Sequence, residues 1–204
     1  MADVAREHAR TPRFVQQAVQ AGDLPVLRMV GRTAVIDDVA VTAWARSLAR
    51  GRRWTPAVRE AAFDLLSTGQ SSWLSSSERS RLRSRLRTMP AQAIAHAAGG
   101  LAGEWARYRT SDVGGLTPIG PSAVDAASLH LVPGSGWVTF VEVNDLDRFE
   151  YQRDVIVDAD GNLGVVRRDH DPREARVLAD CYLLGDARLS AAAAAELEGR
   201  ARGL

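Results

Sequence analysis

The apolar positions near the start of the chain recur with helical spacing. A first predicted helix covers residues 3–9, with Val4, Ala5 and His8 on one face. Thr11 and Pro12 predict the start of a second helix, because threonine is a favoured N-cap and proline fits the first helical turn. The apolar stripe of this second helix follows the i, i+3, i+4 pattern and consists of Phe14, Val15, Ala18 and Val19.

Two short β-prone runs follow this pair of helices. The runs are Val26–Met29 and Thr33–Ile36, and they bracket Gly31, which predicts a β-hairpin. Asp37 and Asp38 then cap a third predicted helix that extends to about residue 48. Its apolar residues at helical spacing are Val41, Trp44, Ala45 and Leu48.

The middle of the chain, residues 51–109, is predicted to be helical. One helix begins at Thr55-Pro56 and ends at Gly69, and a second begins at the capping box formed by Ser75 and Glu78. A short helix precedes Gly99-Gly100, and we expect a further helix over Leu101–Tyr108.

The pattern changes from about residue 110, where glycine and proline become frequent. Trp137–Val143 is predicted to be a strand, and Val155–Val157 with Leu163–Val166 is predicted to form a second hairpin. A capping box at Asp171–Glu174 begins a helix that breaks at Gly185, and a final helix covers residues 189–202. We therefore expect an α+β protein with a mainly helical front and a small α/β C-terminal domain.

Composition adds a marked asymmetry of charge to this picture. All 26 basic residues are arginines and the net charge is +1. Residues 1–109 hold 17 arginines against 9 acidic residues, whereas residues 110–204 hold 9 against 16. A basic front predicts a polyanionic partner, and docking of the two halves on each other is the alternative. With no long apolar run and an acidic residue near the start, we expect no membrane span, no secretory signal and a cytoplasmic protein.

The order helix, turn, helix, hairpin, helix within residues 3–48 resembles the winged helix-turn-helix of MerR and excisionase proteins. The segment Phe14–Pro25 follows that family's V-x-x-A-V-x-x-G-x-L-P pattern, and Arg28, Gly31-Arg32, Val35–Asp37 and Trp44 follow in the expected order. The resemblance implies three parts: a DNA-binding domain at 1–50, a basic helical segment at 51–109 and an acidic partner-binding domain at 110–204.

In such a unit the second helix enters the major groove and the wing contacts phosphates or the minor groove. The resemblance therefore implies base reading by the polar face of the second helix and backbone contacts from its start and from the wing. The implied DNA-binding residues are Arg10, Thr11, Arg13, Gln16, Gln17, Gln20, Arg28 and Arg32. A solvated helix face is the alternative for each glutamine.

The stretch Asp180–Arg188 with the alanine-rich helix after it resembles antitoxins of nucleotidyltransferase-type toxin–antitoxin pairs. This resemblance implies a regulator that binds its own promoter as double-stranded DNA and neutralises a cognate toxin through residues 110–204. Two alternatives stay open: a stand-alone excisionase- or MerR-like regulator with a dimerising or ligand-sensing C-terminal domain, and an enzyme in the second half. A homodimer on a two-fold site is also consistent with the small footprint of one winged helix.

We expect no catalytic residues, no metal and no cofactor. The four histidines are scattered, and the single cysteine, Cys181, has apolar neighbours that predict a core position. The arginines at positions 79, 81, 83, 85 and 87 crowd one helix. They are expected to contact DNA, the acidic half or water, and the sequence does not choose among these.

Overall fold

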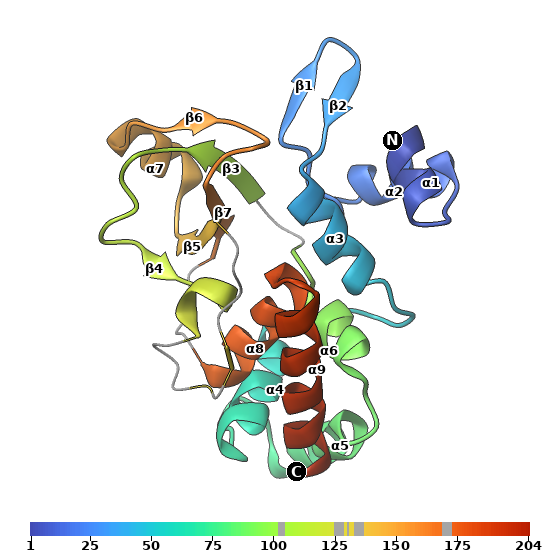
Figure 1. Ribbon diagram of the computed structural model, residues 1–204. Coiled ribbons are helices and arrows are strands. Elements are labelled where there is room, and N and C mark those ends of the chain that lie inside the picture. The colour runs from blue at the N-terminus through green and yellow to red at the C-terminus, as the bar shows by residue number, and fades with distance from the viewer. Residues whose placement is uncertain (102–104, 125–128, 130, 133–136, 169–172) are drawn as a thin grey trace. The chain divides into compact units, whose positions relative to one another are not determined.

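The computed structural model describes residues 1–101, 105–124, 129, 131–132, 137–168 and 173–204. The chain is a mixed α+β protein (Figure 1) whose contacts divide it into two compact units. The first unit contains Met1–Ala45, Leu101–Pro118 and Trp137–His170, and the second contains Arg46–Gly100, Ile119–Gly136 and Asp171–Leu204. These units do not follow the three consecutive segments predicted at 1–50, 51–109 and 110–204, because each unit is assembled from three separated stretches.

The first unit begins with helices and a two-stranded ribbon. Its elements are α1 (Ala2–Glu7), α2 (Pro12–Gln20), β1 (Arg28–Val30), β2 (Thr33–Val35) and α3 (Asp38–Arg46, whose last residue belongs to the second unit). The two strands pair antiparallel, with Val30 opposite Thr33. Gly31 has φ +60°, a left-handed conformation that glycine adopts without strain. These findings confirm the predicted helices and the predicted first hairpin.

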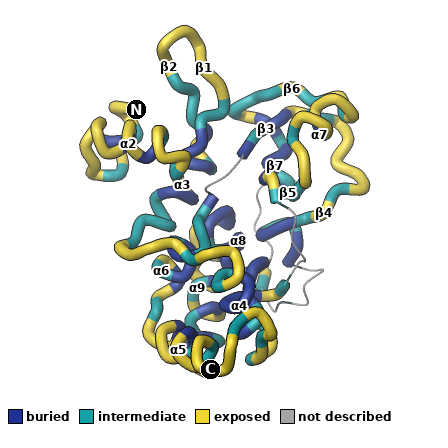
Figure 2. Tube along the Cα trace, turned by 180° about the vertical axis from the view of Figure 1, so that it is seen from behind, coloured by how far each residue is buried: buried dark blue, intermediate teal, exposed yellow. Residues whose placement is uncertain are grey.

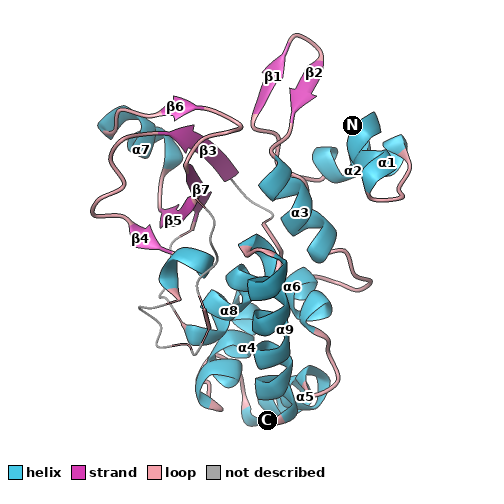
Figure 3. Cartoon of the chain, viewed as in Figure 1, coloured by secondary structure: helices cyan, strands magenta, loops and turns pink. Residues whose placement is uncertain are grey.

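The described residues of the rest of the first unit form a five-stranded sheet and the helix α7 (Figure 3). Its elements are β3 (Trp105–Arg109), β4 (Thr117–Pro118), β5 (Thr139–Val143), α7 (Leu146–Gln152), β6 (Ile156–Val157) and β7 (Leu163–Arg167). The strand order is β4-β5-β7-β3-β6, and the β5–β7 pair is parallel while the other pairs are antiparallel. The buried core of this sheet consists of Tyr108, Val141, Phe149, Leu163 and Val165.

The sheet corrects two predictions from sequence. Residues 105–109 form the strand β3, although the stretch Leu101–Tyr108 was predicted to be helical. The stretches 155–157 and 163–166 do contain strands, but β6 and β7 do not pair as a hairpin, because β3 lies between them. Both errors have one cause: pairing with a strand about 50 residues away is not visible in a local pattern.

The second unit is built mainly from helices. Its elements are α4 (Pro56–Thr68), α5 (Ser76–Leu86), α6 (Ala91–Ala98), the 3-10 turn η1 (Gly120–Ala123), α8 (Glu174–Leu184) and α9 (Ala187–Arg202). Helices α8 and α9 pack against each other and against the other helices around one apolar core that includes Leu65, Leu86, Leu178 and Leu197.

Local signals for helix ends are confirmed in this unit. Thr55 caps α4 and Gly69 ends it in a left-handed conformation. Ser75 and Glu78 form the predicted capping box of α5. The capping box predicted at Asp171–Glu174 begins outside the described residues, and the N-cap of α8 is Arg173, which makes no side-chain cap hydrogen bond.

Candidate nucleic-acid interface

The helix α2 has one buried face and one exposed face. The hydroxyl Oγ1 of Thr11 accepts a hydrogen bond from the backbone N–H of Phe14 at 3.2 Å, which caps the helix start. Val15 and Ala18 are buried, and Leu24 in the loop that follows α2 is also buried. The burial of this apolar stripe holds α2 against the rest of the first unit, and the opposite face of the helix is left in solvent.

The predicted base-reading residues lie on this exposed face. All four of them, Arg13, Gln16, Gln17 and Gln20, are exposed. Residues three and four apart on a helix are neighbours, so these side chains form one polar surface. Thr11 is also exposed, and because its oxygen acts as the acceptor of the cap, its hydroxyl hydrogen is available to donate.

An aromatic contact at the start of α2 was not anticipated. Phe14 was assigned to the buried stripe, but 39% of its surface is exposed. Its ring lies 5.8 Å from the ring of Trp44, and the guanidinium carbon of Arg10 lies 5.6 Å from the centre of the Phe14 ring. A cation–π contact of this kind restrains Arg10 beside the N-terminal end of α2. The only sign of this contact in the sequence was the spacing of four residues between Arg10 and Phe14.

The β1–β2 ribbon presents both charge and apolar surface. Arg28 and Arg32, the predicted wing contacts, are exposed, and Figure 2 shows the turn of the ribbon in the colour of exposed residues. Met29 and Val30 are 59% and 57% exposed, which the sequence reasoning did not foresee. The ribbon thus offers guanidinium groups together with two apolar side chains.

A buried polar network supports the start of α3 in the same unit. Asp37 is buried, and its carboxylate accepts hydrogen bonds from Nη1 of Arg107 (2.8 Å), from Nε1 of Trp105 (2.9 Å) and from the backbone N–H of Val39 (2.8 Å). Burial raises the pKa of Asp37 to about 6, although the Arg107 charge opposes this rise. The network ties the N-terminus of α3 to β3, and of its members the sequence predicted only the capping role of Asp37.

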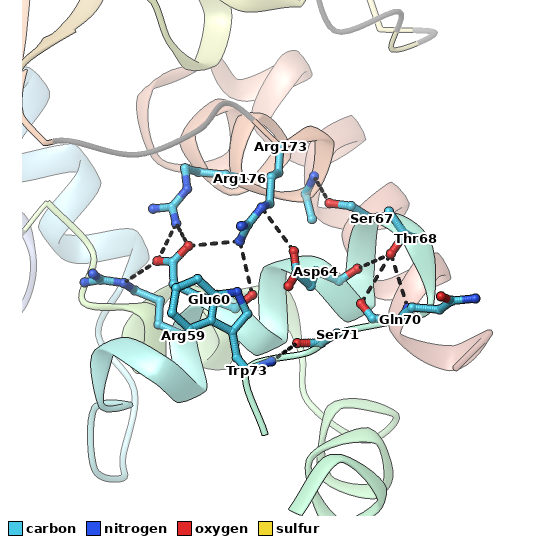
Figure 4. Close-up of polar contacts among 11 residues, drawn as sticks. Arg59, Glu60, Asp64, Ser67, Thr68, Gln70, Ser71, Trp73, Arg173 and Arg176 are labelled. Carbon is cyan, nitrogen blue, oxygen red and sulfur yellow. Dashed lines mark hydrogen bonds and ion pairs between the residues drawn. The ribbon is translucent and has the colours of Figure 1, made fainter. Parts of the chain in front are cut away.

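In the second unit, a cluster of arginines surrounds one carboxylate (Figure 4). Glu60 accepts hydrogen bonds from Nη1 of Arg173 at 2.9 Å and from Nη2 of Arg176 at 2.8 Å. The guanidinium of Arg176 also lies 4.5 Å from the centre of the Phe63 ring. These contacts hold α4 and α8 together, and their role is structural.

The crowded arginines of α5 divide into two sets. Arg79 and Arg83 are half-buried and donate to backbone carbonyls of the loop between α4 and α5, whereas Arg81, Arg85 and Arg87 are exposed. Arg81, Arg85 and Arg87 are therefore more accessible to a large partner than Arg79 and Arg83 are.

Cys181 is fully buried on α8, as its apolar neighbours predicted. Burial raises the pKa of its thiol to about 12, with a smaller contribution from the charge of Asp180. Since the thiolate is the reactive form, we expect no reaction of the native chain with a disulfide reagent at pH 8, and full reaction once the chain is unfolded in guanidinium chloride. Spectrophotometric titration of the thiol measures both, and rapid labelling of native protein would contradict the buried position.

In the part of the chain that the structure describes, no group of three His, Cys, Asp or Glu side chains could hold a metal ion. Among the same residues, no helix is both long and apolar enough to cross a membrane. No protein-family model matches this chain, and comparisons with curated proteins and with solved structures found no match.

Proposed function

We propose that this protein is a double-stranded-DNA-binding transcriptional regulator that reads DNA with α2 and the β1–β2 ribbon of a winged helix-turn-helix. The observation that carries the proposal is the division of α2 into a buried apolar face and an exposed face of one arginine and three glutamines. An exposed helix with planar donor groups fits the major groove, where arginine pairs with guanine and glutamine with adenine. No catalytic role is proposed.

The other predicted residues would position the helix. The ribbon arginines Arg28 and Arg32 lie where a wing contacts phosphates, and the exposed Met29 and Val30 between them add apolar contact in a groove. Arg10 and Thr11 lie at the N-terminal end of α2, where backbone phosphate is favoured by the helix dipole.

The regulator would act in the cytoplasm as the antitoxin of a toxin–antitoxin pair that represses its own operon. Two features support this: the resemblance of residues 180–188 and the acidic balance of residues 110–204, which suits a partner with a basic surface. Much of the 180–188 stretch is buried at the α8–α9 junction, and only Asp186, Ala187 and Arg188 are exposed. Contact with a toxin would therefore depend on other exposed residues of this half.

A second candidate is a stand-alone regulator that senses a ligand, and a cleft in the first unit favours it. The cleft, of about 460 Å³, joins the loop after α2 to the sheet and α7. Its lining includes apolar Leu24 and Trp105 and the carboxylates of Asp147 and Glu150. A cationic ligand with an apolar body would fit this lining and would bind beside the loop that leads into β1.

The test of the proposed function is binding to the DNA upstream of the chain's own operon, measured by fluorescence anisotropy at several salt concentrations. We expect log affinity to fall linearly with log salt, with a slope of about −0.9 per phosphate contacted. Arg32→Ala should make this negative slope shallower by about 1, because one phosphate contact is lost. The double substitution Gln16→Ala with Gln17→Ala should instead relax the sequence preference of binding and leave the slope unchanged.

The matched control is Arg148→Ala, which removes an exposed arginine of α7 in the same unit and outside the proposed interface. Binding of equal strength to the upstream DNA and to unrelated DNA, unaltered by these substitutions, would refute the role of α2. Co-expression with the neighbouring gene product tests the antitoxin role separately, since a true antitoxin restores growth and co-purifies with its toxin.

A further inference from the structure

A polar cleft lies in the second unit, between the C-terminal half of α4, the α4–α5 loop and α5. Its volume is about 550 Å³, and it is lined by Asp64, Thr68, Gln70, Ser71, Ser72, Arg79 and Arg83. Every one of these side chains is polar or charged, and Figure 4 shows those contributed by α4 and the start of the loop. A ligand of this cleft must therefore be held by hydrogen bonds and charge.

Two arginines of α5 are fixed in the lining by the backbone of the loop. Nη1 of Arg79 donates to the carbonyl oxygen of Ser71 at 2.6 Å, and Nη2 of Arg83 donates to the carbonyl oxygen of Gly69. The two residues are four apart and so lie on the same side of the helix. Each guanidinium carries five N–H donors, and these bonds use only part of them.

One of the remaining donors has nothing to bond to. Within the described residues, Nε of Arg83 is buried and has no hydrogen-bond partner. A buried donor without an acceptor is unfavourable, and because this nitrogen has no accessible surface, a ligand oxygen bonds to it only after the Arg83 side chain shifts toward the cleft.

The charge of the lining favours an anion. Asp64 is the acidic residue of the lining, and one of its carboxylate oxygens already lies 3.1 Å from Nε of Arg173. Two guanidinium groups, the hydroxyl of Ser72 and the amide of Gln70 remain as donors, whereas the hydroxyl of Thr68 already donates to the carbonyl oxygen of Asp64 at 3.0 Å. Negative charge, tetrahedral oxygens and bidentate pairing with arginine are the properties of phosphate.

We propose that this cleft binds a phosphate group, at a site separate from the α2 face and the ribbon. The group belongs either to a small phosphorylated compound or to the backbone of a nucleic acid, since both present the same oxygens. The proposal does not require that α2 reads DNA.

The first test titrates inorganic phosphate into the full chain at constant ionic strength, by calorimetry and by NMR of the arginine Nε–H groups. We expect saturable one-to-one binding in the millimolar range and a shift of the Arg83 Nε–H resonance. Arg83→Gln should weaken binding about tenfold or more because a charge-assisted hydrogen bond is lost. Arg85→Gln, an exposed position of the same helix outside the cleft, should leave binding unchanged.

A second variant covers the case in which Arg83→Gln unfolds the loop. Ser72 is exposed and lines the cleft, so Ser72→Ala should preserve the fold and weaken phosphate binding about threefold. Absence of saturable binding, or equal weakening by Arg85→Gln, would overturn the proposal.

The salt dependence of binding to duplex DNA distinguishes the two sources of phosphate. If the group belongs to a nucleic acid, Arg83→Gln should also reduce the magnitude of the salt slope for duplex DNA by about 0.9. If it belongs to a small compound, the slope is unchanged while phosphate binding is lost. Failure of the chain to bind DNA at all would refute the function of α2 and leave the phosphate result standing.

Discussion

Asp37→Ala is expected to destabilise the first unit by about 3 kcal/mol at pH 7.5. At this pH Asp37 is ionised, since its pKa is raised only to about 6. Its removal leaves the guanidinium of Arg107, whose side chain is 5% exposed, without its buried counter-charge, and leaves Nε1 of Trp105 without its acceptor. Breaking one side of a buried ion pair costs more than the pair contributes, because a desolvated charge remains.

Denaturant unfolding followed by circular dichroism measures this loss. The control is Asp38→Ala, whose carboxylate also lies 2.8 Å from Nη1 of Arg107 but whose side chain is 86% exposed, and it should cost less than about 1 kcal/mol. Adding Arg107→Met to Asp37→Ala should recover part of the stability, since no buried charge is then left uncompensated. Equal effects of Asp37→Ala and Asp38→Ala would contradict the role assigned to burial.

Gly161→Ala is the second substitution with a large expected effect, about 3 kcal/mol of destabilisation. A Cβ built on Gly161 would lie 2.1 Å from the carbonyl oxygen of Tyr108, which belongs to the backbone of β3 and pairs with β6 and β7. Backbone in the middle of a sheet cannot move aside without breaking its hydrogen bonds. The carbonyl of Gly161 also accepts from Nε of Arg107 at 3.0 Å, so the displacement would disturb that buried side chain as well.

Gly199→Ala is the control of opposite sign. Gly199 lies within α9, and a Cβ there meets no atom within 4 Å. Alanine should stabilise this helix by about 0.5–1 kcal/mol, because it lowers the entropy of the unfolded chain and favours the helix. Thermal unfolding of both variants checks the pair, and a neutral Gly161→Ala would show that the close approach of these two backbones is absent in solution.

Local interactions explain the parts of the fold that the sequence predicted well. The caps at Thr11, Thr55 and Ser75 depend on contacts between residues three apart, which a short pattern contains in full. The same reasoning predicted which side of α2 is exposed, because Val15 and Ala18 repeat with the helical period. For the candidate interface, the exposed polar face could therefore be foreseen.

Long-range contacts explain what could not be foreseen. Arg107 reads as a surface charge in sequence, yet it is buried because Asp37, 70 residues earlier, supplies its counter-charge. The exposed Met29 and Val30 look like core residues of a ribbon, but the chain provides no layer to cover them among the described residues. The unpartnered Nε of Arg83 depends on how the α4–α5 loop folds back onto α5, which no local pattern states.

By itself the sequence determined the starts of α2, α4 and α5, the first hairpin and the polar face of α2, since these depend on interactions within a few residues. Only the tertiary structure decided that residues 105–109 are a strand between β6 and β7, that Asp37 and Arg107 share a buried ion pair and that two arginines of α5 line a cleft. The physical reason is that strand pairing and the burial of charge need partners from distant parts of the chain. These contacts stabilise the protein only once folding has brought the partners together, so a local pattern in the sequence does not contain them.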